Sequence, residues 1–194
     1  NVLRHIEKID TELITFSDDM DGLRKIPDNI PNNEILKDNL GKPLTSIPDP
    51  FGKFNSFAEH NNTMLKKFLK RFNFDFSFKS STENYKNGKF NESLKRVAEK
   101  YDDIMNIILP TLRSERRKTY CPFLPLCPDT GKVLEIPMLE LNKNNGEVVF
   151  DNNGKKIQTS IYDGNCKLQW KVDWAMRWFT FNVDFEMYGK DLTE

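Results

Sequence analysis

The acidic cluster after the first apolar segment is the first place where residue types and spacing could carry chemistry. In FSDDMDGLRK, Asp18, Asp19 and Asp21 follow that segment directly, and Arg24 lies one helical turn further on. Ligands of open α/β sheets bind at the carboxyl ends of strands, where carboxylates could bind an amine or a metal ion. The same residues could instead form a solvated turn whose acids cap a short helix. Spacing alone leaves both interpretations open.

The cysteines form a second candidate site. A zinc ribbon needs two turns close to C-x-x-C-G, because four thiolates build the tetrahedron. Here Cys127 begins CPDTG, in which Thr130 stands where the second thiolate belongs, and DGNCK offers Cys166 alone. Two ligands of four predict a metal-free relic of such a site. With Cys121 the cysteines number three, without a secretory signal, which favours reduced thiols over disulfides.

All three tryptophans, Trp170, Trp174 and Trp178, lie four residues apart in KLQWKVDWAMRW. This spacing suits one helix face, but KLQWKV alternates like a strand, so we predict a strand through Val172 and a helix from Asp173. We assign Trp170 and Trp178 to an aromatic core layer. Trp174 could face a strand-end pocket, in which an indole lines the aliphatic stem of a ligand, or it could join that core.

The predicted elements that must position these residues are mainly helices early in the chain and strands later. Apolar periodicity predicts helices at 2–9, 56–72 and from Asn91 to Pro110, with strands in TELITFSDD and FDFSFK. The segment 22–52 is rich in proline and reads as a long irregular excursion. From Thr119 the period changes to two, with Asn-Gly hairpin turns at Asn145 and Asn153, which predicts an antiparallel β module. The fold class is therefore α/β, with a β-rich later part.

Composition narrows the function classes. The 29 basic and 29 acidic residues give a net charge of zero, so generic nucleic-acid binding by a positive field is not expected. Without a spanning apolar run or a signal-type start, we expect a soluble, cytoplasmic protein with no membrane partner. The abrupt beginning and end lead us to expect a fragment.

Several segments resemble class I lysyl-tRNA synthetases, in the same order and with compatible spacing over nearly the whole chain. They are FSDDMDGLRKIPDNIP, GKPLTSIPDPFG, SFAEHNN, ILPTLRSERRKTYCPFLP, CPDTGKVL, KLQWKVDWAMRW and VDFEMYGKDL. The resemblance implies part of a lysine-tRNA ligase, which activates lysine with ATP and Mg2+ and transfers it to tRNA(Lys). The HIGH-type and KMSKS-type motifs of that family do not occur in this sequence, so the catalytic residues are unknown and the fragment alone should be inactive.

The resemblance also implies site residues. Asp18, Asp19 and Asp21 would lie near the lysine pocket, Trp174 would line it, and the Lys190-Asp191 loop would close it, although some relatives have histidine after that aspartate. The tRNA acceptor end would contact Arg113, Arg116, Arg117 and Lys118, for which a solvated helix end is the alternative. Zinc is not expected: Asp49 and His60 align with the outer ligands of a D-x-x-x-C-H-x5-H cluster, and Lys53 and Phe54 occupy its inner positions. Asp49, His60, Cys127 and Cys166 thus mark degenerate metal positions.

The resemblance implies a partial Rossmann-type class I synthetase catalytic domain with a connecting insertion of helices and a β-rich, degenerate zinc-ribbon-like module. The expected parts are a catalytic-core part with the long loop (1–55), a helical part of core and insertion (56–118), the β-rich module (119–168) and a return to the core (169–194). The alternative function is a noncatalytic RNA-binding module derived from a synthetase.

Overall fold

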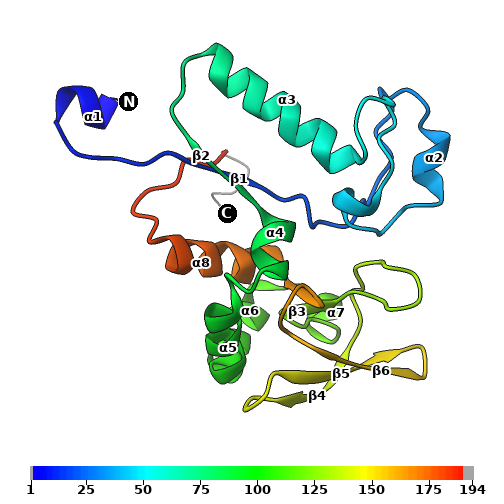
Figure 1. Cartoon of the computed structure of the whole chain (residues 1–194). Coiled ribbons are helices and arrows are strands. Elements are labelled where there is room, and N and C mark those ends of the chain that lie inside the picture. The colour runs from blue at the N-terminus through cyan, green and yellow to red at the C-terminus, as the bar shows by residue number, and fades with distance from the viewer. Residues whose placement is uncertain (1, 190–194) are drawn as a thin grey trace. The chain divides into compact units, whose positions relative to one another are not determined.

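The computed structural model describes residues 2–189, and these divide into two compact units (Figure 1). The first comprises the residues up to Asn84 together with Cys127–Val133. The second comprises Tyr85–Leu126 and the residues from Leu134 onward. Both helices and strands occur in each part of the chain, which confirms the mixed α/β class.

The first unit contains a parallel strand pair. Helix α1 (Val2–Ile6) precedes β1 (Ile14–Ser17), which pairs in parallel with β2 (Ser77–Ser80) so that Ser17 lies opposite Ser80. Parallel strands need a long crossover, and here it contains helix α3 (Phe57–Arg71). The acidic cluster therefore lies at the edge where both strands end, as the sequence predicted.

The long proline-rich segment is mostly irregular but has a small core of its own. It contains helix α2 (Glu34–Lys37) and the 3-10 turn η1 (Leu44–Ser46). Leu36 and Ile47 are fully buried and pack with Leu23 and Phe57. Burial of these apolar side chains holds the segment in place without regular secondary structure.

Helix α3 confirms the helix predicted at 56–72, and several of its apolar side chains are exposed. Ser56 caps it, since its hydroxyl accepts the N–H of Glu59 at 3.1 Å. Four apolar side chains between Met64 and Phe72 are exposed: Met64 by 39%, Leu65 by 36%, Phe68 by 57% and Phe72 by 58%. The buried residues of α3 lie in its first turn, at Phe57, Ala58 and His60.

The helices that follow begin at Ser81 and continue in the second unit. They are α4 (Ser81–Lys86), α5 (Asn91–Glu99), α6 (Tyr101–Ile108), the 3-10 turn η2 (Leu109–Thr111) and α7 (Ser114–Arg117). The predicted single helix from Asn91 is thus interrupted at Lys100. The hydroxyl of Ser80 accepts the N–H of Glu83 at 3.1 Å at the start of α4.

The later strands form two antiparallel sheets. Strand β3 (Phe123–Pro125) pairs with β7 (Cys166–Leu168), while β4 (Met138–Asn142), β5 (Glu147–Asn152) and β6 (Lys155–Ser160) form a meander. Asn153 and Gly154 both have positive φ, as the predicted two-residue hairpin turn requires. Val148, Phe150 and Ile157 are buried, so the meander covers an apolar core with one face.

Helix α8 (Trp170–Phe181) corrects the prediction for the tryptophan segment. Strand β7 ends at Leu168, and the carbonyl of Gln169 accepts the N–H groups of Val172 and Asp173 at 3.0 and 2.8 Å. The helix therefore starts three residues before Asp173 and carries all three indoles. It ends at Asn182, which has the left-handed conformation of a helix C-cap, and the described residues from Val183 to Gly189 form no strand.

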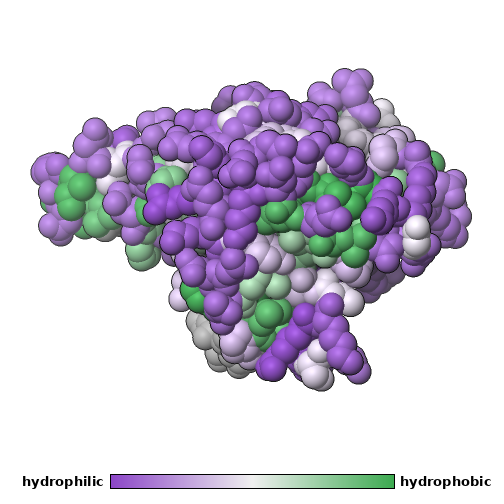
Figure 2. Space-filling model, turned by 90° about the horizontal axis from the view of Figure 1, so that it is seen from below, coloured by the Kyte–Doolittle hydropathy of each residue, from purple (hydrophilic) through white to green (hydrophobic). Residues whose placement is uncertain are grey.

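The face in Figure 2 is largely hydrophilic, with separate hydrophobic patches between the polar residues. Among the described residues, no helix is both long enough and apolar enough to span a bilayer.

Candidate functional site

The ends of β1 and β2 carry a buried polar cluster centred on Asp19. Its two carboxylate oxygens accept the N–H of Thr82 at 2.8 Å and the side-chain amide of Asn62 at 3.0 Å. Asn62 in turn accepts the hydroxyl of Ser17 at 2.6 Å. Asp19 is 2% exposed, so its carboxylate joins β1 to α3 and to the start of α4 rather than facing solvent. The carboxylate needs such donors because an unpaired buried charge is costly.

The two flanking aspartates are more accessible. Asp18 is exposed and Asp21 is half-buried, and its N–H donates to the Asp18 carbonyl at 2.9 Å. These two, rather than Asp19, are the acids at this edge that a ligand could reach. All three aspartates belong to the first unit.

In the second unit, an aromatic group surrounds one carboxylate. The indole N–H groups of Trp174 and Trp178 both donate to the same oxygen of Glu186. Trp174 lies between Trp170 and Trp178, with ring centroids 5.9 and 5.0 Å away, and the ring of Tyr188 meets it edge-on at 6.0 Å. Negative charge beside aromatic rings can bind an organic cation.

The exposure of these indoles corrects the predicted core layer. Trp170 is 48% exposed and Trp178 is 39% exposed, while Trp174 is half-buried. Glu186 and Tyr188 were not among the predicted site residues. Their spacing of two, directly after the tryptophan helix, was the available signal. Lys190 and Asp191, the predicted closing loop, lie outside the described residues.

Helix α8 is anchored one residue before Trp174. The hydroxyl of Tyr85 donates to Asp173 at 2.5 Å and accepts the N–H of Leu168 at 2.9 Å. Arg177, one turn further along α8, forms an ion pair with the same aspartate. Burial and the negative charge of Asp173 raise the pKa of Tyr85 well above its ordinary value, so the hydroxyl keeps its proton and donates it. The direction in which Trp174 leaves the helix follows from this contact.

The family described as tRNA synthetases class I (K) matches residues 1–194. The chain belongs to the class I (K) tRNA synthetases. It is 53% identical over 187 residues to a lysine–tRNA ligase of Rickettsia bellii strain OSU 85-389, an alignment that covers 96% of this chain and 36% of the relative. The lysine–tRNA ligases of Rickettsia felis and Rickettsia prowazekii are each 52% identical over 187 residues, covering 96% of this chain. They are covered over 36% and 35% of their own lengths, so the chain spans about a third of these curated relatives.

Within this synthetase chain, the first pair of degenerate metal positions forms a hydrogen-bonded turn. Asp49 accepts the N–H groups of Phe51, Lys53 and Phe54 at 3.1, 2.9 and 3.0 Å, and His60 Nδ1 lies 3.1 Å from the same carboxylate. Burial opposes the charge of Asp49, but these hydrogen bonds together lower the pKa of the carboxyl. His60 stacks on Phe51 at 4.2 Å between ring centroids. The Asp49 carboxylate is already occupied by these donors, and Lys53 and Phe54 provide no metal ligand at the two inner positions, so the residues do not fit zinc.

The second pair of degenerate positions is divided between the units, with Cys127 in the first and Cys166 in the second. Cys127 begins a closed turn: the N–H of Gly131 binds its carbonyl at 2.8 Å, and Gly131 has φ of +68°. A hydrogen bond from the Thr130 side chain lowers the pKa of the Cys127 thiol. Burial acts in the opposite direction, and the N–H groups of Thr130 and Asp129 lower the pKa further. Burial raises the pKa of Cys166. Across residues 2–189, no three His, Cys, Asp or Glu side chains gather as metal ligands would.

The basic segment predicted to contact tRNA is partly engaged within the synthetase chain. Arg116 forms an ion pair with Glu135 at 2.7 Å. Arg117 donates to the carbonyls of Leu112 and Pro110 at 2.7 and 3.2 Å. Arg113 and Lys118 are exposed. Of the four predicted phosphate ligands, Arg117 therefore stabilises the turn before α7, Arg116 is paired with Glu135, and the other two face solvent.

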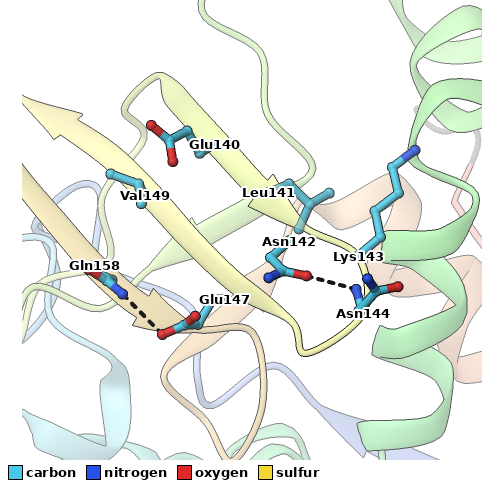
Figure 3. A pocket seen from close by; sticks show the side chains of 8 residues that line it. All are labelled: Glu140, Leu141, Asn142, Lys143, Asn144, Glu147, Val149 and Gln158. Carbon is cyan, nitrogen blue, oxygen red and sulfur yellow. Dashed lines mark hydrogen bonds between the residues drawn. The ribbon is translucent and has the colours of Figure 1, made fainter.

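The meander contains a shallow hollow that none of the predicted site residues lines. Figure 3 shows its eight lining side chains, which come from β4, β5, β6 and the β4–β5 turn. Gln158 donates to Glu147 at 3.0 Å, and the N–H of Asn144 donates to Asn142 at 3.0 Å. Its polar groups bond to one another across an open surface, which is typical of a solvated sheet face rather than of a pocket for a small molecule.

Proposed function

We propose that this chain is the lysine-selecting part of a class I lysine–tRNA ligase whose complete form uses lysine, ATP with Mg2+, and tRNA(Lys). Membership of the family and the names of the Rickettsia relatives support the ligase class. The observation that carries the proposal within the chain is the carboxylate of Glu186, shared by the indole N–H groups of Trp174 and Trp178.

The proposed chemistry of recognition follows from these groups. Lysine carries an ammonium ion at the end of a four-carbon apolar stem. The stem can lie along the indole of Trp174, and the ammonium can approach Glu186 and the neighbouring ring faces. The Glu186 carboxylate would select lysine over an uncharged amino acid of similar size, because a site built to bind a charged group rejects an analogue without that group.

Other assignments stay proposals of the same kind. Asp18 and Asp21 are proposed ligand contacts at the strand ends, and Lys190 with Asp191 is proposed as the closing loop. The Rossmann-type core, the degenerate zinc-ribbon-like module and the cytoplasmic location are proposed from the family. A noncatalytic RNA-binding module is the alternative function, and it predicts no response to lysine.

The test of the proposal is titration of this chain with lysine and with norleucine, which lacks the ammonium, followed by tryptophan fluorescence. We expect a saturable change with lysine and none with norleucine at the same concentration. Trp174→Ala should weaken lysine binding by about 1–3 kcal/mol, because it removes the apolar wall. Glu186→Gln should weaken it similarly without lowering thermal stability.

The matched control is Glu140→Gln, which removes an exposed carboxylate from β4 of the same unit. Lysine binding should be unchanged in this variant. Equal responses to lysine and norleucine would refute the assignment of Glu186 as the group that binds the lysine ammonium. Equal losses of lysine binding in Glu140→Gln and Glu186→Gln would refute it too. Because Trp178 shares Glu186 and is not buried, we also expect Trp178→Ala to affect lysine binding and not stability alone.

A further inference from the structure

The second half of α3 presents a surface that the proposed function does not use. Phe68 and Phe72 are 57% and 58% exposed, and their ring centroids lie 4.9 Å apart. Phe74, just after the helix, is 41% exposed. Neighbouring exposed rings of this size are uncommon on a surface unless something binds there.

Cations surround these rings. Lys67, Lys70 and Arg71 are exposed and follow the i, i+3, i+4 spacing that places side chains on one strip of a helix. Lys66 lies over the ring of Phe78 at 4.0 Å and adds a fourth positive charge. None of the ion pairs found among residues 2–189 involves these four cations. The acid of α3 is Glu59, in its first turn, so the second half of the helix carries positive charge alone.

Two simpler explanations cover only part of this surface. Lys70 and Arg71 near the C-terminus of α3 favour the helix dipole, but that effect accounts for no exposed phenylalanine. A covering apolar segment would account for the rings, but it would leave three cations beside it without counter-charges. A nucleic acid accounts for both the exposed rings and the cations, because its bases stack on aromatic rings while its phosphates bind lysine and arginine.

We propose that this α3 surface, formed by Lys67, Phe68, Lys70, Arg71 and Phe72, binds unpaired nucleotides of an RNA. Phosphates contact the three cations, and bases stack on the two rings. The identification of that RNA as tRNA(Lys) rests on the proposed function. The surface is separate from the predicted tRNA contacts at 113–118, where two of the four cations are engaged within the chain.

The experiment is a fluorescence anisotropy titration of this chain with labelled tRNA(Lys) transcript, and with a duplex RNA of equal length that has no unpaired nucleotides. Lys70→Glu with Arg71→Glu should weaken tRNA binding at least about tenfold. The slope of log K against log salt should fall by about 1.4 to 1.8, since each phosphate contact contributes about 0.7 to 0.9. The matched control is Lys95→Glu with Lys100→Glu, which makes the same charge change at two exposed lysines of the second unit.

The aromatic part is tested with Phe68→Leu and Phe72→Leu, which keep an apolar side chain and remove the ring. Each should weaken binding of the transcript about fivefold or more and leave binding of the duplex unchanged, because a paired base cannot stack on the ring. Circular dichroism and thermal unfolding of each variant verify that the fold is kept.

Several outcomes would overturn the inference. They are an absence of tRNA binding by the unmodified chain, equal losses in the two charge-reversal variants, and Phe→Leu variants that bind the transcript normally. Sedimentation that reveals a dimer dissociated by Phe68→Asp would mean that a second copy covers the surface instead. The lysine titration on the same preparations separates this inference from the proposed function, since either can fail while the other succeeds.

Discussion

At the scale of single residues, the most informative contacts join groups far apart in the sequence. Tyr85 and Asp173 are 88 residues apart, and both are almost fully buried. The tyrosine hydroxyl bridges the last residue of β7 and the first turn of α8. Because Trp174 follows Asp173 directly, a structural hydrogen bond also sets the position of a candidate ligand-binding indole.

Tyr85→Phe should lower the free energy of unfolding by about 1–3 kcal/mol. The change leaves the N–H of Leu168 and one oxygen of Asp173 buried without that partner, and such groups cost more than the hydrogen bond itself contributes. Urea unfolding followed by circular dichroism measures the effect. Tyr101→Phe is the control, because Tyr101 is only half-buried. Equal losses in both variants would contradict the importance of the Tyr85 hydroxyl.

At the scale of elements, turns that could hold metal ligands keep their shape through hydrogen bonds. The Asp49 turn is closed by three backbone N–H groups and His60, and the Cys127 turn by backbone bonds on both sides. In each turn these hydrogen bonds within the protein hold the backbone in place. The stability of these elements is therefore expected not to depend on a metal ion.

The purified chain should contain well under one zinc per molecule, because one thiol per turn cannot form a tetrahedral site. Elemental analysis measures the metal content, and thermal unfolding with and without a chelator should give the same midpoint. Stoichiometric zinc that disappears in Cys127→Ser or Cys166→Ser would prove that other ligands complete a site. Cys121→Ser serves as the control, since Cys121 lies in neither turn.

At the scale of the whole molecule, the chain corresponds to about a third of the length of its curated relatives. It matches the class I (K) synthetase family along its length but spans 36% of the Rickettsia bellii relative. Formation of an adenylate needs groups that stabilise the charge developing on the reacting phosphates. The HIGH-type and KMSKS-type motifs, which the family resemblance assigns to ATP, do not occur in these 194 residues.

This chain alone should therefore give no lysine-dependent ATP–pyrophosphate exchange above background. A longer protein that contains this sequence together with both motifs should be active, and Trp174→Ala in that protein should raise the KM for lysine. The exchange assay with lysine as the varied substrate measures both effects. Exchange by the isolated chain would contradict the assignment of ATP chemistry to residues outside it.

The sequence alone determined the local elements whose signals are short-range. A strand followed by three acids, the helix at 56–72 and the Asn153-Gly154 turn all depend on neighbouring residues, and all were predicted correctly. The resemblance to class I synthetases was also available from ordered segments, and the family match confirms it. Such features are readable because capping and turn preferences act within a few residues.

Tertiary structure decided which faces are buried and which polar groups meet. Only pairing with β3 ends β7 at Leu168 and lets α8 begin at Trp170, so the alternation in KLQWKV was misleading. The fold also decided the partners of Asp19, whose carboxylate binds Asn62 and Thr82, 43 and 63 residues away in the sequence. Apolar periodicity predicted α3, yet the described residues leave its apolar side chains Met64, Phe68 and Phe72 exposed. Periodicity reports that a helix has an apolar side, but burial depends on long-range packing that no local pattern contains.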